Sequence, residues 1–183
     1  MEVTEFSLSG LKLIKLKSIK DDRGFFCERY KTNAFEEIGL GSFIQDNFSR
    51  SAAQVARGLH YQWDKPQGKL ITCLRGEVFD VAVDIRKNSP TYGQHVSVIL
   101  RGDDPHWFWV PAGFAHGFCV LGNQEADLMY KVNNYWSGTG ESGIIWNDPD
   151  LKISWPIENP LLSPKDAKLQ SFKNYSLDPK FSI

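Results

Sequence analysis

The sequence predicts an all-β protein, a sandwich or barrel of many short strands with few helices. Short runs rich in Val, Ile, Phe and Tyr recur along all 183 residues, with glycine and proline between them. Only 31–39 and 163–172 have a helical composition. Because the chain contains no repeat, low-complexity tract or linker, we expect one domain over 1–183, with its core in about 21–170 and a helical tail over 163–183.

The expected strands follow one another closely. They cover residues 11–17, 24–30, 43–48, 57–62, 69–75, 77–85, 94–100, 107–110, 116–121 and 126–134. In 77–85 one face is wholly apolar, whereas the other alternates apolar residues with Asp80 and Asp84. Such a strand is expected to have one side on a core and the other on a cavity or solvent.

Two further strands have one face that suits a polar-lined interior. Gln45 and Asn47 share a face of 43–48, and Tyr130 shares its face of 126–134 with apolar residues, which predicts that Tyr130 points inward. The C-terminal helix would begin at Ser163 as N-cap, with Asp166 at the third helical position.

The composition is that of a soluble globular protein, with 42% hydrophobic and 23% charged residues. A net charge of −1 gives no general attraction to nucleic acid or to anionic membranes. No apolar run is long enough to span a membrane, and the N-terminus lacks a signal-peptide pattern. Cys27, Cys73 and Cys119 are far apart and odd in number, which predicts free buried thiols and a cytoplasmic location.

The segment 57–70 holds the most informative polar residues, His60 and Lys69. A histidine base and a cation that converge on one cavity are what proton abstraction beside a carbonyl needs. The simpler alternatives are a structural, hydrogen-bonded histidine and a solvated surface lysine. Arg57 has the opposite parity to His60 on a regular strand, so either a bulge intervenes at Gly58 or Arg57 serves elsewhere.

Three residues further along the chain are candidates for the same chemistry. The phenol of Tyr130 can give or take a proton, and a carboxylate such as Asp166 can pair with a histidine base. His116, between Ala115 and Gly117, is equally compatible with a structural role. Each has a simple alternative, because Tyr130 suits a core position and Asp166 suits the helix dipole.

The histidine spacing argues against a catalytic metal. No two of the four histidines form the HxH pattern that metal-binding β-barrels use, and position 62 is Gln62. The motifs GxSxG, GxGxxG and the P-loop are also absent from the sequence.

Nine motifs, in order from about residue 21 to 169, together resemble the dTDP-4-dehydrorhamnose 3,5-epimerase family. They are DDRGFF, QDN.S, RGLHYQ, QGKL, RGEVFDVAVDIRKNSPTYGQ, WVPAGFAHGF, MYK, WNDPDL.I.WP and LLSPKDA. The resemblance implies a cupin-type jelly roll that forms a homodimer and uses no metal or other cofactor. The implied reaction converts dTDP-4-dehydro-6-deoxy-D-glucose to dTDP-4-dehydro-L-rhamnose, in dTDP-L-rhamnose biosynthesis.

The resemblance also implies roles for individual residues. His60 resembles the base that removes the C3 and C5 protons, and Asp166 resembles its partner carboxylate. Lys69 resembles the cation that stabilises the enolate oxygen. Tyr130 resembles the acid that reprotonates from the opposite face, and His116 resembles a second histidine of the pocket.

Six further residues match family positions that hold the nucleotide and sugar. They are Arg23, Phe26, Glu28, Gln45, Asn47 and Arg57. In the family the DDRGFF segment reaches the partner subunit's site, so dimerisation and function would be coupled. Trp136 stands where the family frequently has a tyrosine, which implies a difference near the nucleotide.

Three alternatives remain open from the sequence. A relative with the same residues could epimerise only C3, or act on another 4-keto sugar nucleotide. A metal-dependent oxygenase of the cupin type would need the missing HxH spacing. A non-catalytic sugar-binding barrel would not need the full set of proton-transfer residues.

Overall fold

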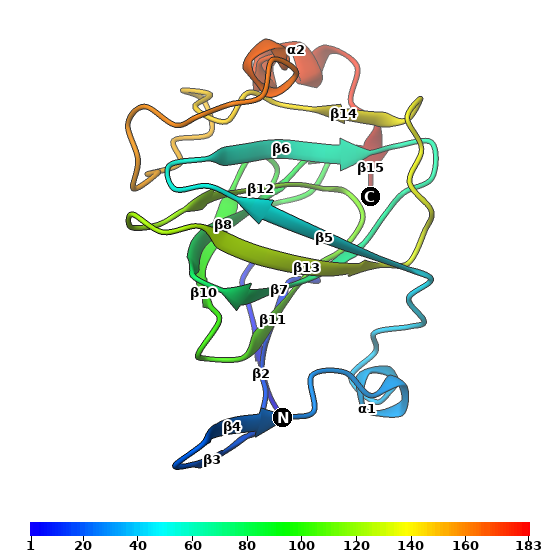
Figure 1. Ribbon diagram of the computed structural model, residues 1–183. Coiled ribbons are helices and arrows are strands. Elements are labelled where there is room, and N and C mark those ends of the chain that lie inside the picture. Colours follow the sequence, from blue (N-terminus) through cyan, green and yellow to red (C-terminus); the bar gives the residue numbers. More distant parts are fainter.

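The structure is a computed structural model that describes residues 1–183. Two antiparallel sheets face each other in a sandwich, the jelly-roll architecture that the family resemblance implies (Figure 1). Their strands are β1 Glu2–Glu5, β2 Lys12–Lys15, β5 Gln45–Ser51, β6 Ala56–Gln62, β7 Lys69–Arg75, β8 Glu77–Asp84, β10 His95–Arg101, β11 His106–Val110, β12 Phe114–Val120, β13 Ala126–Val132 and β14 Glu141–Gly143. The six-stranded sheet has the order β1-β2-β11-β7-β13-β5, and the five-stranded sheet has the order β10-β8-β12-β6-β14.

The remaining elements are short and lie outside these sheets. They are the hairpin of β3 Ser18–Asp21 and β4 Gly24–Cys27, the parallel pair of β9 Arg86–Lys87 and β15 Phe181–Ser182, the helices α1 Thr32–Glu36 and α2 Phe172–Leu177, and the 3-10 turn η1 Asp166–Lys168. None of the helices has the length and apolar character needed to cross a membrane.

The central core fills the space between the two sheets, and β8 shows how. Val78, on its mixed face, packs in one cluster with Ile71 and Phe108 of the facing sheet. The wholly apolar face packs outward, where Val83 and Tyr175 of α2 belong to a second cluster. The mixed face therefore points into the barrel, as one reading of its alternation predicted, and the other face is covered by the C-terminal segment.

The C-terminal helix predicted over 163–172 is wrong in extent. Ser163 does cap the turn, because its Oγ accepts a hydrogen bond from the amide of Asp166 at 3.0 Å. Only the turn η1 follows, since Gln170 is drawn into a bridge with Ile144. A new helix, α2, then begins after Ser171, whose side chain is its N-cap.

Other boundaries also differ from the prediction. The strand expected over 24–30 ends at Cys27, where the chain leaves the hairpin, and the strand expected to end at residue 48 continues to Ser51. The three cysteines are free thiols, as predicted; Cys73 and Cys119 are buried, whereas Cys27 is only partly buried.

The loop from β8 to β10 is organised around the fully buried carboxylate of Asp84. Arg86 donates to both of its oxygens, from Nε at 2.9 Å and from Nη2 at 2.7 Å. The hydroxyls of Ser89 and Thr91 each donate at 2.6 Å. Burial alone would raise the pKa of Asp84, but these hydrogen bonds hold it at about 2.

Replacing Asp84 with asparagine is expected to lower the free energy of unfolding at pH 7 by about 2 kcal/mol. The pKa of Asp84 lies below its ordinary value of 3.8, so the charge stabilises the fold at neutral pH and ceases to do so as the pH falls towards 2. Urea unfolding at pH 7 and pH 3 would measure this. An Asp84→Asn deficit that is equal at both pH values would contradict the assignment, and Asp46→Asn on the surface is the matched control.

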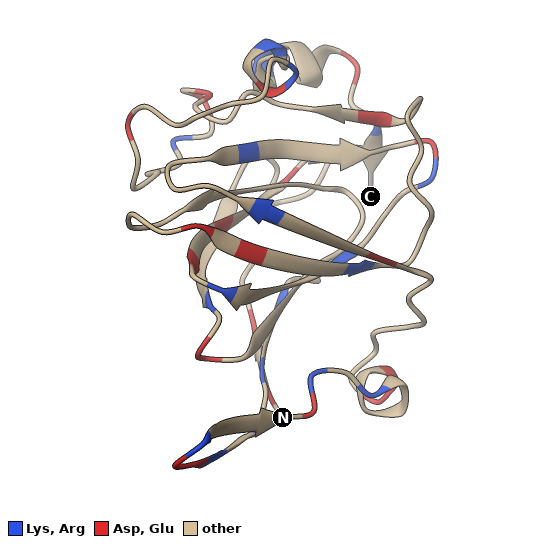
Figure 2. Ribbon diagram, in the orientation of Figure 1, with Lys and Arg blue, Asp and Glu red and all other residues tan.

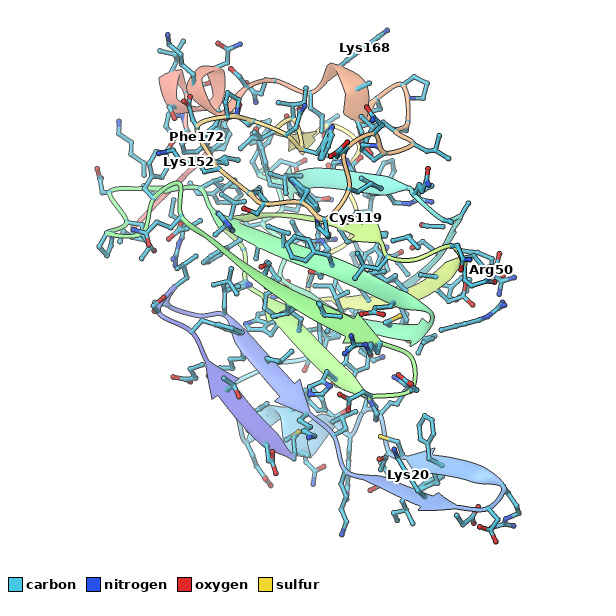
Figure 3. All side chains as sticks on the ribbon, turned by 90° about the vertical axis from the view of Figure 1, so that its left-hand side faces the viewer. Lys20, Arg50, Cys119, Lys152, Lys168 and Phe172 are labelled. Carbon is cyan, nitrogen blue, oxygen red and sulfur yellow. The ribbon has the colours of Figure 1, made fainter.

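The β3–β4 hairpin projects away from the two sheets (Figures 1 and 3). Lys20 of this hairpin lies at the opposite end of the molecule from Lys168 and Phe172 (Figure 3). Figure 2 shows charges of both signs at its turn, where Arg23 pairs with Asp21. Phe26 is 65% exposed, so the hairpin presents an uncovered apolar side chain.

Candidate active site

A cavity of about 220 Å³ lies between the two sheets. One side is formed by β5, β7 and β13, and the other by β6, β12 and β14. Its lining residues are Ser49, Arg57, His60, Lys69, Ile71, His116, Gly117, Phe118, Leu128, Tyr130 and Glu141. Five residues that the sequence nominated therefore meet here: Arg57, His60, Lys69, His116 and Tyr130.

The strand register places the lysine and the tyrosine on one wall. Tyr130 of β13 is opposite Ile71 of β7 on one side and opposite Asn47 of β5 on the other. Lys69 is two residues before Ile71, so its side chain is on the same face of the sheet. The inward orientation predicted for Tyr130 is confirmed, since it also packs against the central core.

A β-bulge in β6 places Arg57 and His60 on the opposite wall. His60 is opposite His116, while Arg57 is opposite Phe118, so β6 holds one residue more than β12 between these pairs. Gly58 makes this possible, because its φ of +109° is unfavourable for residues with a side chain and a Cβ would lie 2.6 Å from the Cα of Gly117. Of the two readings that the sequence left open, the bulge is confirmed.

His60 forms a pair with Asp166 behind the cavity wall. Its Nε2 lies 2.6 Å from Oδ1 of Asp166, whose side chain is only 4% exposed. Burial would raise the pKa of this carboxyl, but hydrogen bonds from His60, the Gly58 amide and Ser163 hold it below its ordinary value. The ionised carboxylate accepts from Nε2–H, which leaves Nδ1 with a free lone pair to act as a base.

His116 has a carboxylate partner of its own. Its Nε2 lies 2.8 Å from Oδ1 of Asp80, which is fully buried on β8. The second oxygen of Asp80 has no hydrogen-bond partner. The two cavity histidines are thus both oriented by acidic residues.

Burial shifts the pKa values of both Lys69 and Tyr130. Burial lowers the pKa of Lys69 to about 8, against the charges of Glu141 and Asp80, which raise it. Burial also raises the pKa of Tyr130, assisted by Glu141, so its phenol keeps its proton at neutral pH. The cavity therefore joins a base, a proton donor and a cation.

The remaining nominated residues lie outside the cavity. Gln45 and Asn47 share the face of β5 that carries Ser49, and they are joined by a hydrogen bond of 2.9 Å. The hairpin carries Arg23 and Phe26, and Glu28 follows it; none of the three lines this chain's own cavity.

Sequence reasoning missed three residues of the site. Ser49 continues the alternation of Gln45 and Asn47, but the expected strand stopped one residue short. Glu141 is in β14, whose three residues are too few for a periodic signal. Asp80 was recognised on a mixed strand face, yet nothing local indicated its pairing with His116.

The acidic and histidine side chains are paired rather than clustered. No group of three or more His, Cys, Asp or Glu side chains is arranged to hold a metal ion. His95 and His106, which belong to β10 and β11, do not line the cavity.

Comparison with known proteins identifies the family. The family model described as dTDP-4-dehydrorhamnose 3,5-epimerase matches residues 5–174. The chain belongs to this family. The enzyme of this name from Shigella flexneri is 49% identical over 94% of this chain and 96% of its own length.

A solved structure agrees with the fold of this family member. The dTDP-6-deoxy-D-glucose-3,5-epimerase of Legionella pneumophila, in complex with dTDP-4-keto-L-rhamnose, superposes with a TM-score of 0.89 at 49% identity. The match covers 93% of this chain and 92% of that chain. A more distant relative, the dTDP-4-dehydrorhamnose 3-epimerase of Streptomyces niveus, is 37% identical over 91% of this chain and 81% of its own length.

Proposed function

We propose that this chain epimerises dTDP-4-dehydro-6-deoxy-D-glucose at C3 and C5. The observation that carries the proposal is the placement of His60 and Tyr130 on opposite walls of one cavity. A base on one side of a sugar ring and a proton donor on the other side are what inversion of a carbon centre requires.

The first step removes the proton from C3, beside the C4 ketone. Nδ1 of His60 takes this proton, and the electron pair of the C–H bond moves through the new C3–C4 double bond onto the ketone oxygen. The carboxylate of Asp166 stabilises the imidazolium that forms. The ammonium group of Lys69 stabilises the enolate oxygen.

The second step adds a proton to the opposite face of C3. The phenol of Tyr130 donates this proton as the enolate returns its electron pair to carbon. Both groups then exchange protons with solvent, which restores the neutral imidazole and the neutral phenol. The same sequence at C5, on the other side of the ketone, completes the double epimerisation.

The test is to incubate the protein with dTDP-4-dehydro-6-deoxy-D-glucose in D2O and to follow the sugar by NMR. We expect deuterium at both C3 and C5, and rhamnose when a 4-keto reductase and NADPH are added. If neither carbon exchanges its proton, the proposal is overturned and the sugar-binding barrel is favoured.

A C3-only epimerase is the second candidate, because a relative of that name matches most of the chain. The five sequence-nominated residues that line the cavity do not separate the two outcomes, since each inversion uses the same base and acid. Deuterium at C3 alone in the same experiment would identify the mono-epimerase.

The active form that we propose is a homodimer in which the hairpin of one chain completes the partner's site. The exposed side chains of Ile19, Phe25 and Phe26 support this, because a hairpin with three uncovered apolar residues suits burial against a second copy. Arg23, Phe26 and Glu28 would then contact the nucleotide beside the partner's cavity, while Arg57 would contact the diphosphate from within its own chain.

Co-expression of two inactive variants tests this dimer. Phe26→Ala damages the hairpin and His60→Asn damages the cavity, so each variant alone is expected to be impaired. A mixed dimer has one site with an intact hairpin and an intact base, and random pairing gives about a quarter of wild-type activity. A mixture no more active than the two separate variants would argue against a shared site.

A further inference from the structure

Glu141 is the one acidic residue that lines the cavity. It lies on β14, the edge strand of the five-stranded sheet, opposite Gln62 of β6. Gly143, two residues later, is opposite His60, so the Glu141 side chain is on the face of β14 that looks towards the catalytic residues. The mechanism above gives this carboxylate no part in proton transfer.

An ion pair fixes the Glu141 side chain at this position. Nζ of Lys165 lies 2.5 Å from Oε2 of Glu141. Glu141 is 26% exposed, and its lysine partner is 54% exposed, so the ion pair lies at the edge of the cavity. A carboxylate held there at a fixed position exerts a field on the charges inside the cavity.

Several other charged and titratable groups lie around Lys69. Arg57 and His60 face it from β6, His116 from β12 and Tyr130 from β13. Asp80 of β8 is bonded to His116, and Asp166 is bonded to His60. Lys165 is bonded to Glu141 on the outer side, and Glu141 is the one carboxylate that lines the cavity together with Lys69.

We propose that Glu141 is a positioning residue whose negative charge keeps Lys69 in its ammonium form during catalysis. The inference rests on the proposed function, because it is the enolate that needs a charged Lys69. It assigns to Glu141 an electrostatic role in the reaction, distinct from its structural pairing with Lys165.

The sign of the effect follows from the charges. Burial lowers the pKa of Lys69 to about 8, and the charge of Glu141 is the largest influence that opposes burial. Although burial raises the pKa of Glu141, the ion pair with Lys165 holds it below its ordinary value, so the carboxylate is ionised at neutral pH. Removing its charge therefore lowers the pKa of Lys69 further, and Lys69 loses its proton at a lower pH.

The experiment is an NMR titration of protein labelled with ¹³C at the lysine ε-carbons, with the Lys69 signal assigned by its loss in Lys69→Arg. We expect Glu141→Gln to lower the Lys69 midpoint by about one pH unit. Asp46→Asn is the matched control, since it breaks an ion pair with Lys131 on the outer face of the sheet. It is expected to leave the midpoint unchanged.

Two further variants separate charge from structure. Lys165→Gln removes the same ion pair but keeps the Glu141 carboxylate, so the Lys69 midpoint is expected to stay or rise. Glu141→Asp keeps the charge with a shorter side chain, and the midpoint is expected to remain near that of the wild type. A midpoint unmoved by Glu141→Gln, or lowered equally by Lys165→Gln, would overturn the proposal.

The pH dependence of the epimerisation rate tests whether the charge of Lys69 matters for catalysis. At pH 8 the Glu141→Gln variant is expected to lose about fivefold more activity, relative to wild type, than it loses at pH 6.5. The two proposals fail separately. Inactive wild-type protein would contradict the epimerase function, but the Lys69 titration would still measure the effect of the Glu141 charge. An active enzyme whose Lys69 midpoint is unchanged by Glu141→Gln would contradict the role of Glu141 alone.

Discussion

Replacing His60 with asparagine is expected to lower kcat/KM about 1,000-fold or more while leaving the fold intact. The imidazole is the base that removes the substrate proton in our proposal, and asparagine cannot accept that proton at neutral pH. Its amide can still donate to Asp166, so the buried carboxylate keeps a hydrogen-bond partner. The measurement is steady-state epimerisation, coupled to a 4-keto reductase.

The matched control is His106→Asn, which removes an imidazole from β11, outside the cavity. We expect it to retain wild-type kcat/KM. Circular dichroism and the melting temperature of both variants report on the fold. A His60→Asn enzyme with kcat/KM within tenfold of the wild-type value would contradict the assignment of His60 as the base.

Replacing Tyr130 with phenylalanine is expected to separate proton exchange from inversion. The ring keeps its place against the core, but the proton donor on that wall is lost. His60 can still remove the C3 proton and return a deuteron to the same face, so exchange in D2O continues while formation of the epimer falls about 100-fold. NMR of the substrate measures both processes in one sample.

Tyr92→Phe is the control for this variant, because Tyr92 also carries a phenol but bonds to Ser176 on the surface. It should change neither process. If exchange and inversion fall together in Tyr130→Phe, then Tyr130 does more than deliver the second proton, and the division of roles between the two walls is wrong.

The inward faces of the strands were predictable because their signal is local. Alternation along a strand reports which side chains share a face, and this placed Tyr130 inside the barrel. The same rule would have found Ser49 if the strand had been extended by one residue. Arg57 was the informative exception, since its parity conflicted with that of His60 and the conflict proved to be a bulge.

Features that depend on distant partners were not available from local patterns. The segment 163–172 has a helix start at Ser163, but the helix does not continue through Gln170, because Gln170 pairs with Ile144. Asp166 looked locally like an acid favoured by a helix dipole, whereas its side chain bonds to a histidine 106 positions earlier. The resemblance to the family indicated that pairing, and no spacing in the sequence does so.

The bulge between β6 and β12 imposes a reciprocal constraint on how this site can change through evolution. A Cβ at Gly58 would lie 2.7 Å from the carbonyl oxygen of His116, and a Cβ at Gly117 would lie 2.7 Å from that of Arg57. Neither glycine can acquire a side chain unless the strands separate, and separation would turn Arg57 or His60 away from the substrate. A relative that keeps the histidine at position 60 but carries a side chain at either glycine position is therefore expected to lack epimerase activity. We expect it to bind sugar nucleotides without converting them.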